Sequence, residues 1–176
     1  MVYVFLADGF EELEAIAPVD LLRRAGVRVN TISLSNPVVG SLNIAVHCDS
    51  SRMDMDACTG VILPGGPGHV VLAQSNLVHR CLAAVSEKGG MLAAICAAPS
   101  ILGKLGYLKG KRATCYPGFE DKLTGATVVD ESVVIDGNVI TARAAGSSIA
   151  FGLACVEYLC GTEVANKIAA KICYDR

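Results

Sequence analysis

Residues 92–100, LAAICAAPS, form the stretch that decides both the fold and the candidate site of this chain. A short apolar segment bounded upstream by Gly89 and Gly90 is typical of a buried strand. The strand ends at Cys96, and Pro99 suits the first turn of a helix, where the missing N–H of proline costs little. The stretch therefore predicts a sharp strand-to-helix turn at Cys96.

A cysteine at such a turn has two interpretations. The turn resembles a nucleophile elbow, whose flanking positions must be small, as Ala94 and Ala98 are here. The amides and the dipole of the following helix would favour a thiolate at Cys96. Alternatively, Cys96 is an inert core residue, because free cysteine is among the most buried residue types. The stretch alone leaves both interpretations open.

Length and composition indicate one α/β domain. The chain has 176 residues, 52% of them hydrophobic, and a mean hydropathy of +0.48, which suits a sheet covered on both faces. The net charge of −2, without a basic block, argues against nucleic acid or an anionic membrane as a partner. The longest uncharged run, residues 59–78, contains PGGPG, so we expect no membrane span. Acidic residues at Asp8 and Glu11 argue against a signal peptide.

The cysteines favour a reducing compartment. None of them forms a CxxC pair, and most lie within apolar stretches, so the sequence predicts reduced thiols in a cytoplasmic protein, without disulfides or a zinc site. The eight are Cys48, Cys58, Cys81, Cys96, Cys115, Cys155, Cys160 and Cys173.

The start of the chain follows a strand–helix–strand pattern. We predict a strand at residues 2–7, a helix at residues 11–25 that ends at Gly26, and a strand at residues 27–34. Pro18 should kink the helix or make it restart, because proline removes a backbone hydrogen bond. A βαβ unit has parallel strands and a right-handed crossover, so the sequence predicts a mostly parallel sheet.

The rest of the chain continues this alternation. Residues 38–47 form a hairpin-like excursion, and Asp136 followed by Gly137 is the strongest hairpin signal in the chain. In the last long helix we expect Ile149 to face the core. One further strand is predicted at residues 60–63 and another in the apolar stretch that ends at Cys96. The remaining strands are predicted at residues 112–115, 126–130, 132–136 and 138–142. Helices are predicted at residues 75–88, 99–103, 119–123, 146–160 and 163–172.

Two segments should meet Cys96 at the carboxyl edge of the sheet. Residues 64–68, PGGPG, directly follow a buried strand, and glycines there let backbone N–H groups approach a ligand closely. A plain tight turn is the alternative, and no phosphate-binding GxxxxGK[ST] pattern is present. Glu14 follows the first strand closely enough to point over the same edge, although a solvated helix glutamate is the simpler interpretation.

Four motifs, in this order and spacing, resemble the Parkinsonism-associated deglycase family of the ThiJ/PfpI superfamily. They are DGFEELEAIAPVDLLRRAG at residues 8–26, VILPGG at 61–66, AAICAAP at 93–99 and TARAAGSSIAFGLACVE at 141–157. The resemblance runs nearly end to end and implies a single ThiJ/PfpI-like domain over residues 1–176. It implies an α/β, flavodoxin-like three-layer sandwich with helices on both faces and a small antiparallel hairpin. It also implies a homodimer packed partly through the first helix.

The resemblance further implies an oxidation-prone cysteine at Cys96 and a buried Glu14 that reaches it. Two adjacent like charges are disfavoured, so a Cys96 thiolate requires Glu14 to stay protonated, and burial of a carboxyl group permits this. The protonated acid would then donate a hydrogen bond to the sulfur, and the pair would titrate as a unit. We expect the backbone amides of Gly65, Gly66 and Ala97 to form an oxyanion pocket.

One position departs from the family pattern. Human-type members carry a histidine beside the cysteine, in a His-Pro pair, whereas Tyr116 precedes Pro117 here. Tyr116 is then a candidate hydrogen-bond donor, and Glu14 is left as the sole acid and base. His69 follows the glycine-rich segment and could approach the site, but we expect it to sit in solvent. The peptidase branch is disfavoured because it has a histidine where this chain has Ala97.

The resemblance, together with Cys96, Glu14 and the glycine-rich segment, implies a cysteine-dependent glyoxalase or deglycase that acts on glyoxal and methylglyoxal. Such a protein would contribute to protection against oxidative stress and would need no metal or other cofactor. A different class of function is a redox sensor or chaperone that responds to oxidation of Cys96. A role in thiamine-precursor metabolism is a third possibility, which the ThiJ name suggests and no specific residue supports.

Overall fold

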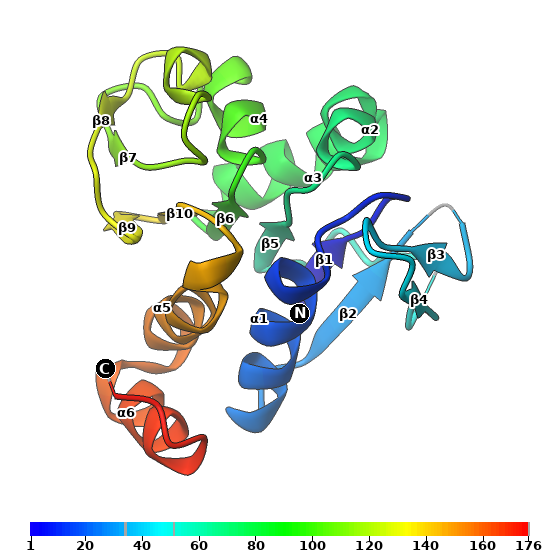
Figure 1. Cartoon of the computed structure of the whole chain (residues 1–176), viewed down its shortest axis with the longest axis vertical. Coiled ribbons are helices and arrows are strands. Elements are labelled where there is room, and N and C mark those ends of the chain that lie inside the picture. The colour runs from blue at the N-terminus through cyan, green and yellow to red at the C-terminus, as the bar shows by residue number, and fades with distance from the viewer. Residues whose placement is uncertain (34, 51, 176) are drawn as a thin grey trace.

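A six-stranded sheet forms the centre of the molecule (Figure 1). The structure is a computed structural model that describes residues 1–33, 35–50 and 52–175. Five strands run parallel, and the sixth, β9, pairs antiparallel with its neighbour β10. The predicted α/β fold is therefore confirmed. The strand order is β2 (Val29–Ile32), β1 (Val2–Phe5), β5 (Gly60–Leu63), β6 (Met91–Ile95), β10 (Val139–Ala142) and β9 (Val133–Asp136).

Helices cover both faces of this sheet (Figure 1). Successive side chains of a strand point to opposite faces, so each central strand contributes to two cores. In β1, Val2 and Val4 belong to one core, whereas Tyr3 and Phe5 belong to the other. The first core is covered by α1 (Glu12–Arg24), α5 (Ser148–Cys160) and α6 (Thr162–Lys171), and the second by α2 (His69–Gln74), α3 (Asn76–Glu87) and α4 (Pro99–Lys104).

Short elements complete the fold at the sheet edges. The predicted hairpin at residues 38–47 is confirmed as β3 (Val38–Val39) paired antiparallel with β4 (Ala45–Val46). A second small pair, β7 (Arg112–Ala113) and β8 (Thr127–Val128), is parallel. Two 3₁₀ turns lie at Glu120–Lys122 and Ala145–Ser147. Within the described residues, no helix is long and apolar enough to cross a membrane.

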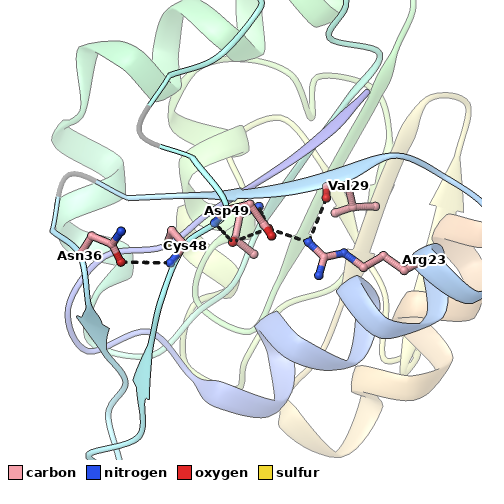
Figure 2. A network of polar contacts seen from close by, with 6 residues as sticks. Arg23, Val29, Asn36, Cys48 and Asp49 are labelled. Atoms are coloured by element: carbon pink, nitrogen blue, oxygen red, sulfur yellow. Dashed lines mark hydrogen bonds and ion pairs between the residues drawn. The ribbon is translucent and has the colours of Figure 1, made fainter.

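Polar contacts fix the second strand against the end of the first helix (Figure 2). The Asp49 carboxylate accepts hydrogen bonds from the backbone N–H and the hydroxyl of Thr31, both at 2.8 Å. Arg23 of α1 donates to the same carboxylate at 2.6 Å and to the carbonyl of Val29 at 3.0 Å. The network therefore holds the carboxyl end of α1 against β2, while the other end of α1 carries Glu14.

Four local features differ from the expectations. The first helix does not restart at Pro18, since α1 runs from Glu12 to Arg24. Helix α5 packs closely on this part of α1, because a Cβ at Gly152 would lie 3.0 Å from the Pro18 Cα. Helix α2 was not predicted, because its six residues are too few for a periodic pattern. Ile149 was expected to face the core but is 41% exposed, whereas Ser148 and Phe151 of the same turn of α5 are buried. The second strand is shorter than predicted, and Leu34, its expected last residue, lies outside the described residues.

Candidate active site

Cys96 occupies a strained turn between β6 and α4, as predicted. Its φ of +64° lies in the left-handed region that residues other than glycine rarely adopt, and such strain is concentrated at functional sites. The Cys96 N–H donates to the carbonyl of Ala142 at 2.9 Å, and the Cys96 carbonyl accepts from the N–H of Tyr116 at 2.8 Å. Both backbone groups are therefore held, while Cys96 itself is only half-buried.

Glu14 points from the first turn of α1 to the sulfur of Cys96. Its side chain is 1% exposed, and its carboxylate accepts a hydrogen bond from the N–H of Gly65 at 2.8 Å. The carboxyl group is also hydrogen-bonded to the Cys96 thiol. Glu11 fixes this turn of the helix, because its carboxylate accepts from the N–H of Glu14 at 2.8 Å. Glu14 is therefore not the solvated helix glutamate that the sequence left as the simpler interpretation.

The glycine-rich segment lies directly against this pair. A Cβ at Gly65 would lie 2.8 Å from Glu14 Oε2 and 3.0 Å from Cys96 Sγ, so only a residue without a side chain fits there. The N–H groups of Gly66 and Ala97 face the Cys96 sulfur. The structure thus brings all three predicted amides together. However, the N–H of Gly65 serves the carboxylate, and the other two serve the sulfur.

Burial dominates the electrostatics of the pair. It raises the pKa of the Glu14 carboxyl to about 7, against the opposing effect of the hydrogen bonds from Gly65 and Cys96. Burial and the negative charge of Glu14 together raise the pKa of the Cys96 thiol to about 12, although the amides of Gly66 and Ala97 act in the opposite direction. While Glu14 is ionised, Cys96 therefore keeps its proton at neutral pH. This differs from the thiolate beside a neutral acid that the sequence suggested.

The two descriptions differ only in the position of one proton. A thiol beside a carboxylate and a thiolate beside a carboxylic acid hold the same number of protons, so transfer along the hydrogen bond interconverts them. The pair as a whole loses its first proton near pH 7 and its second near pH 12. At neutral pH it therefore contains one mobile proton beside a nucleophilic sulfur.

Comparisons with known proteins assign the chain to a protein family. The sequence profile of the DJ-1/PfpI family matches residues 1–158. Protein dj-1beta of Drosophila melanogaster is 39% identical over 94% of this chain and 92% of the relative. The chain belongs to the DJ-1/PfpI family. The crystal structure of Drosophila DJ-1beta superposes with a TM-score of 0.91 at 35% identity, over 99% of this chain and 98% of that one. The glutathione-independent glyoxalase DJR-1.2 of Caenorhabditis elegans is 34% identical over 93% of this chain and 90% of the relative.

Three ring side chains pack together next to the Cys96 turn and the glycine-rich loop in this DJ-1/PfpI member. Tyr116 is 47% exposed and meets Phe119 edge to face, with ring centroids 6.4 Å apart. The expectation that His69 sits in solvent is wrong. Its ring nitrogen Nδ1 is 2.8 Å from the carbonyl oxygen of Gly66, and its ring packs against Phe119. Sequence reasoning missed Phe119. The position of His69 directly after PGGPG was the available signal for its place beside the loop.

A further feature of the described residues is the distribution of their possible metal ligands. Among the described residues, no group of three or more histidine, cysteine or acidic side chains could hold a metal ion.

Replacing Gly65 with alanine should destabilise the folded protein. The added Cβ would lie 2.7 Å from the Cys96 Cβ, and accommodating it should cost about 1–3 kcal/mol of the free energy of unfolding. Gly146→Ala is the matched control, because an added Cβ there meets no atom within 4 Å. Urea unfolding measures both variants. Equal stabilities for the two would contradict the close contact described at Gly65.

Proposed function

We propose that this protein is a cysteine-dependent glyoxalase that converts glyoxal and methylglyoxal to hydroxy acids without a cofactor. The observation that carries this proposal is the contact between the buried carboxyl of Glu14 and the half-buried thiol of Cys96. The similarity to a glutathione-independent glyoxalase of Caenorhabditis elegans supports it. All eight cysteines are free thiols, which suits the reducing cytoplasm.

The first step is addition of the sulfur to the aldehyde carbon. As the C–S bond forms, the Cys96 proton passes to the Glu14 carboxylate, and the carbonyl electron pair moves to the oxygen. The N–H groups of Gly66 and Ala97 stand beside the sulfur, where they would stabilise the developing negative charge. Glu14 then returns the proton to this oxygen, which completes a hemithioacetal and restores the carboxylate.

The second step moves a hydrogen between adjacent carbons. Glu14 removes a proton from the hemithioacetal carbon, the electron pair forms an enediol, and Glu14 delivers a proton to the neighbouring carbon. The product is a thioester of the hydroxy acid. Water then breaks the C–S bond and restores the thiol, so the net reaction is addition of one water without an oxidant. A carboxyl pKa of about 7 suits a group that must both accept and donate a proton at neutral pH.

Redox protection is a second candidate function that uses the same sulfur. The Cys96 thiol is half-buried rather than enclosed, so a small peroxide can reach it. A sulfinate formed there would accept hydrogen bonds from the two backbone amides and from protonated Glu14. Preferential oxidation of Cys96 among the eight cysteines, measured by peptide mass spectrometry, would support this function.

We also propose a homodimer that uses the exposed apolar surface of α1 and the adjoining hairpin. Leu13 and Ile16 of α1 are 60% and 42% exposed. Leu42 and Ile44, between β3 and β4, are 75% and 57% exposed. A cluster of exposed apolar side chains is typical of an interaction surface.

The glyoxalase proposal is tested by product formation without glutathione. The parent protein should convert methylglyoxal to lactate, and Cys96→Ser should form no lactate above the buffer background. Cys173→Ser is the matched control, because Cys173 is an exposed thiol far along the chain from the site, and this variant should retain full activity. Lactate formation at the parent rate by Cys96→Ser would refute the proposal.

A further inference from the structure

A second pair of thiols meets at the opposite edge of the sheet from Cys96. Cys58 lies just before β5, at the amino edge, and Cys81 lies on the face of α3 that packs on β5 and β6. Their sulfur atoms are 3.7 Å apart, and the residues are 1% and 0% exposed. The glyoxalase chemistry proposed above uses neither of them.

We propose that Cys58 and Cys81 form a redox site that reduces one hydroperoxide molecule per protomer by closing an intramolecular disulfide. The Cys58 sulfur attacks the O–O bond, which yields a sulfenic acid and one molecule of water or alcohol. The Cys81 sulfur then displaces the sulfenic hydroxyl, which leaves as water with the Cys81 proton. Two thiols thus lose two electrons and two protons, and the hydroperoxide takes up both.

The geometry permits the bond. A disulfide requires a sulfur separation of about 2.05 Å, so the two atoms must approach by about 1.7 Å. Cys58 belongs to an irregular segment between residues 52 and 59, which lies outside regular secondary structure and can shift more readily than a strand. Cys81 is held in the middle of α3 and offers a fixed partner.

Hydrogen bonds assign the attacking role to Cys58. Its thiol can donate to the carbonyl of Gly60 at 3.5 Å, which leaves the Cys81 thiol as donor to the Cys58 sulfur. This bond from Cys81 lowers the pKa of Cys58, with help from the positive charges of the Met1 amino group and Lys88. The same contact raises the pKa of Cys81 and keeps it protonated, which suits the second, resolving thiol.

Access to the pair is through the segment that covers it. The Met1 amino group donates to the carbonyl of Ala57 at 3.0 Å, and Lys88 donates to the carbonyls of Met55 and Asp56 at 3.1 Å. These are hydrogen bonds at or near the protein surface, in a segment without regular structure. Local opening of such segments requires less free energy than global unfolding, so a small hydroperoxide can reach the thiols in the folded protein.

Hydrogen peroxide tests the site in the parent protein. After treatment the protein is quenched in acid, unfolded, alkylated with iodoacetamide and digested without reductant. We expect the peptides of Cys58 and Cys81 from one protomer to be disulfide-linked, with the loss of both alkylated thiols and their recovery after dithiothreitol. Two findings would overturn the proposal: both thiols still alkylated when Cys96 is fully oxidised, or Cys58 linked to a different cysteine.

Variants separate this site from the proposed glyoxalase centre. Cys96→Ser retains both thiols, so the link should still form there whether or not the glyoxalase proposal holds. In Cys81→Ala, the Cys58 peptide should carry sulfinic acid instead of a link. Cys155→Ala is the matched control, because Cys155 is equally buried but has no part in the pair, and the link should form as in the parent.

Discussion

Glu14→Gln should lower kcat for methylglyoxal about 10³-fold, which corresponds to about 4 kcal/mol in the activation barrier. Glutamine has nearly the same shape and can still accept the hydrogen bond from Gly65, so the turn around Cys96 should stay in place. However, an amide cannot take a proton from one carbon and return it to the next. Steady-state lactate formation without glutathione measures the effect.

Glu87→Gln provides the control for this substitution. Glu87 lies at the exposed carboxyl end of α3, remote in the fold from the elbow, and its replacement should leave kcat unchanged. If Glu14→Gln retained turnover within a factor of about two of the parent, Glu14 would not be the proton shuttle.

The same Glu14→Gln substitution should make the folded protein more stable at alkaline pH. The Glu14 carboxyl has a pKa of about 7 in the folded state, against 4.5 ordinarily, so the folded state holds its proton more tightly than the unfolded chain does. The contribution of this bound proton to the free energy of unfolding is fully present below pH 4.5 and is lost as the pH rises through 7. The difference between the two pKa values corresponds to about 3 kcal/mol in the free energy of unfolding.

Urea unfolding of the parent and of Glu14→Gln at a series of pH values measures this effect. The stability advantage of the glutamine variant should grow by about 3 kcal/mol between about pH 4.5 and pH 8. Glu87→Gln should show no such growth, because Glu87 is exposed. A constant difference between parent and Glu14→Gln would mean that burial does not raise the pKa of this carboxyl.

Much of the fold follows from local sequence signals. The glycine pair at residues 89–90, the apolar strand and Pro99 at the first position of α4 define the elbow, because each has a local conformational preference. Ser75 caps α3 as its residue type predicts, and its side chain accepts from the N–H of Val78. The uninterrupted apolar residues of β1 and β6 correctly predicted a sheet buried on both faces.

The remaining features depend on contacts between distant segments. Glu14 and Gly65 are 51 residues apart, so the sequence could not show that the N–H of Gly65 is bound to the carboxylate instead of facing a substrate. The balance of charge between Glu14 and Cys96 depends on their burial, which only the packed structure gives. Cys58 and Cys81 likewise lie 23 residues apart, and no local pattern links them.

The central claim is that Cys96 and Glu14 form one titrating pair, active when it has lost its first proton. The pH dependence of kcat/KM for methylglyoxal, measured from about pH 5 to pH 9 without glutathione, tests it most directly. We expect kcat/KM to rise about tenfold per pH unit below about pH 7 and to reach a plateau above it, with no such rise in Glu14→Gln. A parent profile that is flat across pH 7, or an equal rise in Glu14→Gln, would contradict it.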